Sequence, residues 1–151
     1  MSGALVLQVD GTPGSPPRGV AGLGIVVRRV SGAPVRCHTA RAAATTNNEA
    51  EYQALIAGLE LLLACFPGAR CCVLTDSQIV VEQLAGRSAV RAPQLVPLHA
   101  RATELLARCH QPTLHLIGRE LNLLADALAW EALAGRGRLR AAVHQATHIA
   151  D

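Results

Sequence analysis

The 151-residue sequence contains few aromatic residues and no lysine. It has one Trp, one Tyr and one Phe, so its core must be built from Leu, Val, Ile and Ala. Half of the residues are hydrophobic, which excludes an intrinsically disordered chain. All 14 basic residues are Arg, whose planar guanidinium suits phosphate oxygens, but the formal net charge is only +3. Such a mild positive excess is weak support for a nucleic-acid partner.

Long apolar runs are also missing. The first ten residues, MSGALVLQVD, have no basic residue before their apolar run, and this argues against a signal peptide. The most apolar stretch, residues 54–66, is interrupted by Glu60 and is too short to cross a bilayer. The five cysteines are odd in number and form no C-x-x-C pair. We therefore expect reduced thiols in a cytoplasmic protein with no membrane partner.

The rest of the sequence predicts one domain of strands and helices. Apolar, β-branched runs bounded by turn residues indicate five strands, over residues 4–9, 20–29, 33–41, 70–74 and 113–117. Apolar residues at helical spacing indicate four helices, over residues 46–66, 77–85, 93–109 and 121–133. Strands that are joined through helices should be parallel, whereas the second and third strands should pair antiparallel at one edge. We expect an α/β fold, a five-stranded mixed sheet with helices on its faces.

Three acidic residues occupy positions that a purely structural role does not explain. Asp10 closes the first strand and Asp76 closes the fourth. Since these two strands should be neighbours, their carboxyl ends should meet at one edge of the sheet, where sites form in α/β proteins. Asp126 lies on a largely apolar stripe of the last helix, LNLLADALAWEAL, where a carboxylate is costly unless it is paired or bound to metal.

A fourth carboxylate comes from the helix that begins TTNNEAEYQAL. Steps of three and four residues from Glu49 follow a polar face, whereas the same steps from Glu51 follow an apolar face. Thr46 and Glu49 also fit a capping box, in which Glu49 reaches back to the start of the helix. Glu49 should therefore be structural, and Glu51 should point into the protein.

Carboxylates that converge repel one another and remain ionised together only beside cations. Ligation by oxygen alone suits Mg²⁺ or Mn²⁺. Two such ions about 3.5–4 Å apart are suited to in-line displacement at a phosphate.

The residues that carry this pattern resemble ribonuclease H type 1. The matching pieces are VDGT, TTNNEAEYQAL, TDSQ and N-x-x-AD-x-LA, which occur in that order across residues 4–134. The resemblance implies a five-stranded mixed sheet of order 3-2-1-4-5, with strand 2 antiparallel and helices on its flanks. It implies a catalytic domain over residues 1–135, followed by a short basic tail over residues 136–151.

The activity that the resemblance implies is endonucleolytic hydrolysis of the RNA strand of RNA–DNA hybrids, giving 5′-phosphate and 3′-hydroxyl ends. We expect a monomer whose partner is the hybrid. The catalytic metal ligands, for two Mg²⁺ ions that Mn²⁺ can replace, are then Asp10, Glu51, Asp76 and Asp126. The substrate-binding residues are Gly11, Thr46, Asn47, Asn48 and Gln78. Asn and Gln suit the reading of RNA 2′-hydroxyls because each can donate and accept hydrogen bonds.

One position departs from the family pattern. Many relatives carry a His on a loop just before the last Asp, and that position falls here on Arg119, between Gly118 and Asn122. An Arg cannot act as a general base at pH 7. We predict that Arg119 instead contacts the scissile phosphate or the leaving product; the alternative is an ordinary surface charge.

Two other functions fit the same fold. One is a nuclease that also cuts double-stranded RNA, and the other is a catalytically silent module that binds hybrids. The presence of all four carboxylates argues against the silent module. Asn47, Asn48 and Gln78 favour a hybrid that contains RNA.

Overall fold

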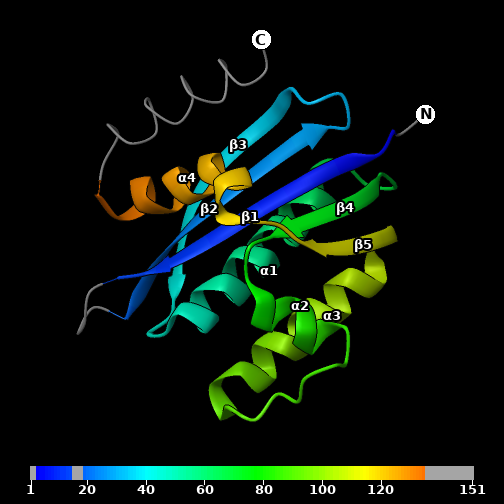
Figure 1. Cartoon of the computed structure of the whole chain (residues 1–151). Coiled ribbons are helices and arrows are strands. Elements are labelled where there is room, and N and C mark those ends of the chain that lie inside the picture. The colour runs from blue at the N-terminus through cyan, green and yellow to red at the C-terminus, as the bar shows by residue number, and fades with distance from the viewer. Residues whose placement is uncertain (1–2, 15–18, 135–151) are drawn as a thin grey trace.

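Five strands form one mixed sheet in the computed structural model, which describes residues 3–14 and 19–134 (Figure 1). The strands are β1 (Leu5–Pro13), β2 (Val20–Arg29), β3 (Pro34–Ala43), β4 (Arg70–Thr75) and β5 (His110–Leu116). Their order is β3-β2-β1-β4-β5, with β2 antiparallel to both neighbours and β4 parallel to both of its own. The expected strand order is confirmed. The expected basic tail lies outside the described residues.

Helices cover the two faces of the sheet unequally (Figure 1). They are α1 (Asn47–Cys65), α2 (Gln78–Leu84), α3 (Val96–Arg108) and α4 (Leu123–Ala134), with short 3-10 turns η1 (Pro93–Leu95) and η2 (Arg119–Leu121). The main core lies between the sheet and α1 with α3. A smaller core, on the other face, joins Val26 of β2 to Leu124, Ala125 and Leu128 of α4.

Two strands differ most from their expected bounds. We expected the first strand to end at Val9, but β1 continues to Pro13 because β2 pairs along it as far as Pro13 with Ala21. The last strand begins at His110 rather than residue 113, because His110 pairs with Arg70 of β4. Asp10 is therefore inside a paired strand and not after one, which fixes its backbone more firmly than the sequence indicated.

Two glycines in β2 let α4 lie directly on the sheet. A Cβ atom at Gly22 would lie 2.0 Å from the carbonyl oxygen of Ala129, and one at Gly24 would lie 1.9 Å from that of Ala125. Any larger residue would push α4 away from the strand. These glycines therefore set the height of α4, and of Asp126, above the sheet.

The helices and the cysteines were also compared with the expectations from the sequence. Within residues 3–14 and 19–134, no helix is both long and apolar enough to span a membrane. All five cysteines are free.

Candidate active site

Three carboxylates meet where β1, β4 and α1 come together. One carboxylate oxygen each of Asp10, Glu51 and Asp76 lies within 4.8 Å of the others. Asp10 and Glu51 are each only 5% exposed, and Asp76 is half-buried. The parallel pairing of β1 with β4 brings Asp10 near the end of β4, as the sequence predicted.

The N-terminus of α1 sets the direction of Glu51. Thr46 is the N-cap residue, and its Oγ1 accepts from the backbone N–H of Glu49 at 3.2 Å. In return, Glu49 Oε2 accepts from the backbone N–H of Thr46 at 2.8 Å. The expected capping box is therefore confirmed. The backbone N–H and hydroxyl of Thr45, together with those of Thr46, donate to the Glu49 carboxylate and lower its pKa.

Glu51 has the opposite surroundings. Its Oε2 is buried and has no hydrogen-bond partner among the described residues. Burial raises the pKa of Glu51, and the nearby Asp76 raises it further, although hydrogen bonds with Asp10 and the backbone of Gly11 oppose the change. A buried oxygen without a partner is costly, so this atom is set up for a ligand that the protein itself does not supply.

Asp10 is the centre of the cluster. Burial raises its pKa well above the ordinary carboxyl range, and the Glu51 and Asp76 carboxylates add to this rise. The oxygen-only donor set, the mutual repulsion and the unpartnered Glu51 oxygen all fit a divalent hard cation such as Mg²⁺. The residues present therefore fit the metal that the sequence pattern implied.

Asp126 approaches from the opposite face of the sheet. It is half-buried on α4 and is not among the three carboxylates that lie within 4.8 Å of one another. It nevertheless hydrogen-bonds with Asp10 and raises the pKa of Asp10 and of Asp76. Asn122, which is 1% exposed, holds this helix start in place: its Nδ2 donates to the Val9 carbonyl at 2.9 Å, and its own carbonyl accepts from Asp126 N–H at 3.0 Å.

Arg119 is exposed in η2, yet its guanidinium acts on the cluster. Burial raises the pKa of Asp76 and of Glu51, and the positive charge of Arg119 partly opposes both rises. The structure therefore puts Arg119 within electrostatic reach of the carboxylates, and not on an unrelated part of the surface.

The expected substrate-binding residues lie at the same end of the sheet. Asn47 and Gln78 are exposed as the first residues of α1 and α2, and Asn48 is half-exposed. Gly11 is buried, and a Cβ atom there would lie 2.0 Å from the Ala50 carbonyl oxygen. Glycine is therefore required at this position for packing β1 against α1. Both donors of Thr46 go to Glu49.

Sequence reasoning missed a buried polar group beneath the cluster. Gln8, which is 7% exposed, donates from Nε2 to the Leu121 carbonyl at 2.9 Å and accepts from Arg28. These bonds help to attach the segment that carries Arg119 and Asp126 to β1. The available signal was a glutamine inside an otherwise apolar strand.

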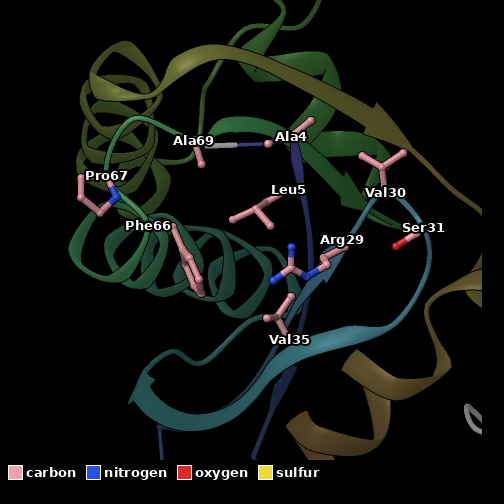
Figure 2. Close-up of a pocket in the computed structure, with 10 residues that line it drawn as sticks. Ala4, Leu5, Arg29, Val30, Ser31, Val35, Phe66, Pro67 and Ala69 are labelled. Atoms are coloured by element: carbon pink, nitrogen blue, oxygen red, sulfur yellow. The ribbon is translucent and has the colours of Figure 1, made fainter. Parts of the chain in front are cut away.

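A cavity of about 500 Å³ lies at the opposite end of β1 (Figure 2). Its lining includes Leu5, Val35, Phe66 and Arg29, and no acidic residue, cysteine or histidine. Leu5 begins β1, whereas Asp10 lies in its second half. The side chains suited to bind a metal therefore lie at the other end of β1, where Asp10 is, and not in this cavity.

Comparison with known proteins places this geometry in context. A family model described as "Reverse transcriptase-like" matches residues 8–132. The bifunctional protein Rv2228c of Mycobacterium tuberculosis is 35% identical over 130 residues, which are 85% of this chain. The chain spans about a third of that relative, 35% of its length.

Solved structures extend the similarity to three dimensions. RNase H1 from the archaeon Halobacterium salinarum superposes with a TM-score of 0.79 at 36% identity, over 86% of this chain and 97% of that one. LC11-RNase H1, solved in complex with an RNA/DNA hybrid, gives a TM-score of 0.77 at 32% identity, over 85% of this chain and 96% of that one.

Proposed function

The chain belongs to the reverse transcriptase-like family and has the ribonuclease H fold, and on this premise we propose that it is a metal-dependent endoribonuclease. Its substrate is the RNA strand of RNA–DNA hybrids. The observation that carries the proposal is the cluster of Asp10, Glu51 and Asp76, with its buried and unpartnered Glu51 oxygen. The LC11 relative, whose structure contains a hybrid, supports the choice of substrate.

The residues that would hold two Mg²⁺ ions are Asp10, Glu51, Asp76 and Asp126. Mn²⁺ could replace Mg²⁺ at the same site. When bound, such ions supply an activated water and stabilise the leaving oxygen of an in-line displacement, which gives 5′-phosphate and 3′-hydroxyl ends. Asp126 would lie at the edge of the metal site, because it comes from α4 and is outside the group of three carboxylates.

Arg119 would contact the scissile phosphate or the leaving product. Its influence on Asp76 and Glu51 supports a position beside the reacting phosphate. Because an Arg stays protonated at neutral pH, it can neutralise and orient a phosphate but cannot accept the proton of the attacking water.

Asn47, Asn48 and Gln78 would read RNA 2′-hydroxyls in the minor groove of the hybrid. Their amides offer donors and acceptors near the cluster. A phosphate contact from Thr46 would have to displace Glu49, which already takes both donors of Thr46. Gly11 would serve the substrate through its backbone, beside its packing role against Ala50.

A cleavage assay tests the proposal. The purified protein is incubated with a labelled RNA–DNA hybrid, with double-stranded RNA and with double-stranded DNA of the same sequence, each with Mg²⁺, with Mn²⁺ or with chelator. Only the RNA strand of the hybrid should be cut, and only with a divalent ion. Equal cleavage by wild type and the Asp10→Asn variant would contradict the proposal. Comparable cleavage of double-stranded RNA would favour the broader nuclease, and binding without cleavage would favour the silent module.

A further inference from the structure

A buried glutamine joins three helices behind the carboxylates. Tyr52, which is fully buried in α1, donates from its hydroxyl to Gln83 Oε1 of α2 at 2.7 Å. His99 of α3 makes a 3.2 Å hydrogen bond from Nε2 to the Gln83 carbonyl, and its ring packs edge-on against Tyr52 at 6.3 Å. Gln83 Nε2 also donates to the Ala89 carbonyl at 3.4 Å.

The helix α2 depends on this glutamine. It has only seven residues, and the buried ones are Val80, Val81 and Gln83. A helix this short is unstable without tertiary contacts. One of the three buried residues that hold α2 in place, Gln83, is therefore polar, and its side chain bonds to α1.

The same helix is rigidly continuous with the end of β4. Ser77 caps α2 through its Oγ, which accepts from Val80 N–H at 3.4 Å, and Thr75 Oγ1 accepts from Ser77 N–H at 3.1 Å. Asp76 lies between these two bonded residues. Its backbone position is therefore tied to that of α2.

These contacts connect the segment that carries Glu51 with the segment that carries Asp76. Tyr52 directly follows Glu51 on α1, and Gln83 is on the helix that begins directly after Asp76 and Ser77. Metal ligands have to be held within about 0.5 Å of their productive geometry by the groups behind them. We propose that Tyr52 and Gln83 are positioning residues, whose hydrogen bond fixes the Asp76 carboxylate relative to that of Glu51 for metal binding. This inference rests on the proposed function.

Two variants separate positioning from ordinary stabilisation. Tyr52→Phe removes the donor and leaves Gln83 Oε1 buried without it, so the melting temperature falls. The double variant Tyr52→Phe/Gln83→Met replaces both partners with apolar groups of similar shape, so most of the melting temperature returns. The second variant lacks the Tyr52–Gln83 hydrogen bond without leaving a buried oxygen unpaired there. It also loses the 3.4 Å bond from Gln83 Nε2 to the carbonyl of Ala89, which is an exposed residue.

The decisive measurement is calorimetric titration with Mn²⁺, alongside hybrid cleavage and melting temperature. Both variants should bind Mn²⁺ about tenfold more weakly than wild type, the lower end of the effect of removing groups that support metal ligands. Val27→Ala is the matched control: Val27 is fully buried in β2 and pairs with Leu7, in the half of the sheet away from the site. It should lower the melting temperature and leave Mn²⁺ affinity unchanged.

Wild-type Mn²⁺ affinity in Tyr52→Phe, or recovery of affinity together with melting temperature in the double variant, would overturn the inference. The same holds if Val27→Ala weakens Mn²⁺ binding as much as Tyr52→Phe does. A wild-type protein that binds Mn²⁺ but does not cut the hybrid would contradict the proposed function alone, because the calorimetric comparison would still decide the positioning role.

Discussion

Two carboxylates in the first turns of α1 have opposite environments. In the capping box, formed by Thr45, Thr46 and Glu49, one oxygen of Glu49 accepts from the backbone N–H and the hydroxyl of both threonines at 2.8–3.0 Å. In the carboxylate cluster, formed by Asp10, Glu51 and Asp76, one oxygen of Glu51 has no partner among the described residues. The pKa of Glu49 is lowered, and that of Glu51 is raised.

The difference separates a group that stabilises the fold from one that strains it. Glu49 is bonded to the donors that a helix start leaves free, so its charge is favourable where it lies. Glu51 is buried beside two other carboxylates, so its charge is unfavourable until a cation arrives. Perturbed carboxylates of this second kind are concentrated at functional sites.

The two glutamates should differ most in how strongly their substitution reduces hybrid cleavage. Glu51→Gln should reduce hybrid cleavage by about 10³-fold, because it removes the negative charge of a ligand to an ion that contributes several kcal/mol to transition-state stabilisation. Glu49→Gln should stay within about twofold of wild type. Single-turnover rates at saturating Mg²⁺ measure both. Similar losses in the two variants would mean that the distinction between them is wrong.

Much of this distinction could be predicted from sequence. The helical period alone puts Glu51 on the apolar face and Glu49 on the polar one, and the Thr46–Glu49 spacing predicts the capping box. The connections between segments also predict which strands are parallel and that β2 and β3 pair antiparallel at one edge, whereas the full strand order was implied by the resemblance to ribonuclease H type 1.

Contacts between distant segments could not be predicted in this way. Asn122 with Val9 and Tyr52 with Gln83 join residues 113 and 31 positions apart. No local period encodes such pairs, since each depends on how separate elements pack. The extension of β1 beyond Asp10 was missed for the same reason: its residues look like a turn until β2 pairs with them.

Divalent ions should stabilise the protein through the cluster and not through the capping box. Mg²⁺ or Mn²⁺ at about 100 times its dissociation constant should add about 2.7 kcal/mol to the free energy of unfolding. The gain should persist in Glu49→Gln and disappear in Asp10→Asn. Thermal melts with and without chelator measure it. A full gain in Asp10→Asn would place the ion elsewhere.

The two regions should also respond to pH with opposite sign. In the metal-free protein the raised pKa values of Asp10 and Glu51 mean that the folded state holds protons more tightly than the unfolded chain does. Their contribution is therefore fully present below about pH 4 and is lost as pH rises. Glu49, whose pKa is lowered, contributes above that range and loses its contribution as pH falls through its folded pKa.

Asp10→Asn tests this sign directly. It removes a carboxylate that repels two others, so the metal-free melting temperature at pH 7 should be unchanged or higher, and its fall with rising pH should be shallower. Asp126→Asn should behave in the same way, to a smaller extent. A large drop in either variant would mean that the carboxylate is structural. Melts in chelator across pH 4 to 8 provide the measurement.

Arg119 should affect cleavage but not stability, because it is exposed and yet acts on the carboxylate cluster. Arg119→Ala should lower hybrid cleavage by about tenfold, or 1.4 kcal/mol, and Arg119→Lys should recover only part of this because Lys lacks the planar fork. The melting temperature should barely change, since Arg119 is exposed. Wild-type cleavage by Arg119→Ala would reduce Arg119 to a surface charge.

The smallest expected effect belongs to the capping box. Glu49→Ala leaves the backbone N–H groups of Thr45 and Thr46 without their acceptor and should cost about 1 kcal/mol of unfolding free energy, as the loss of a cap does.

Glu60→Ala is the matched control, because Glu60 is an exposed glutamate of the same helix with a 3.3 Å ion pair to Arg101. A surface pair of this kind contributes less, so Glu60→Ala should cost under about half as much. Urea titrations resolve the two, and Mn²⁺ affinity should be unchanged in both. If Glu49→Ala weakened Mn²⁺ binding, the capping box would have to help hold Glu51 in place, and the two regions would not be independent.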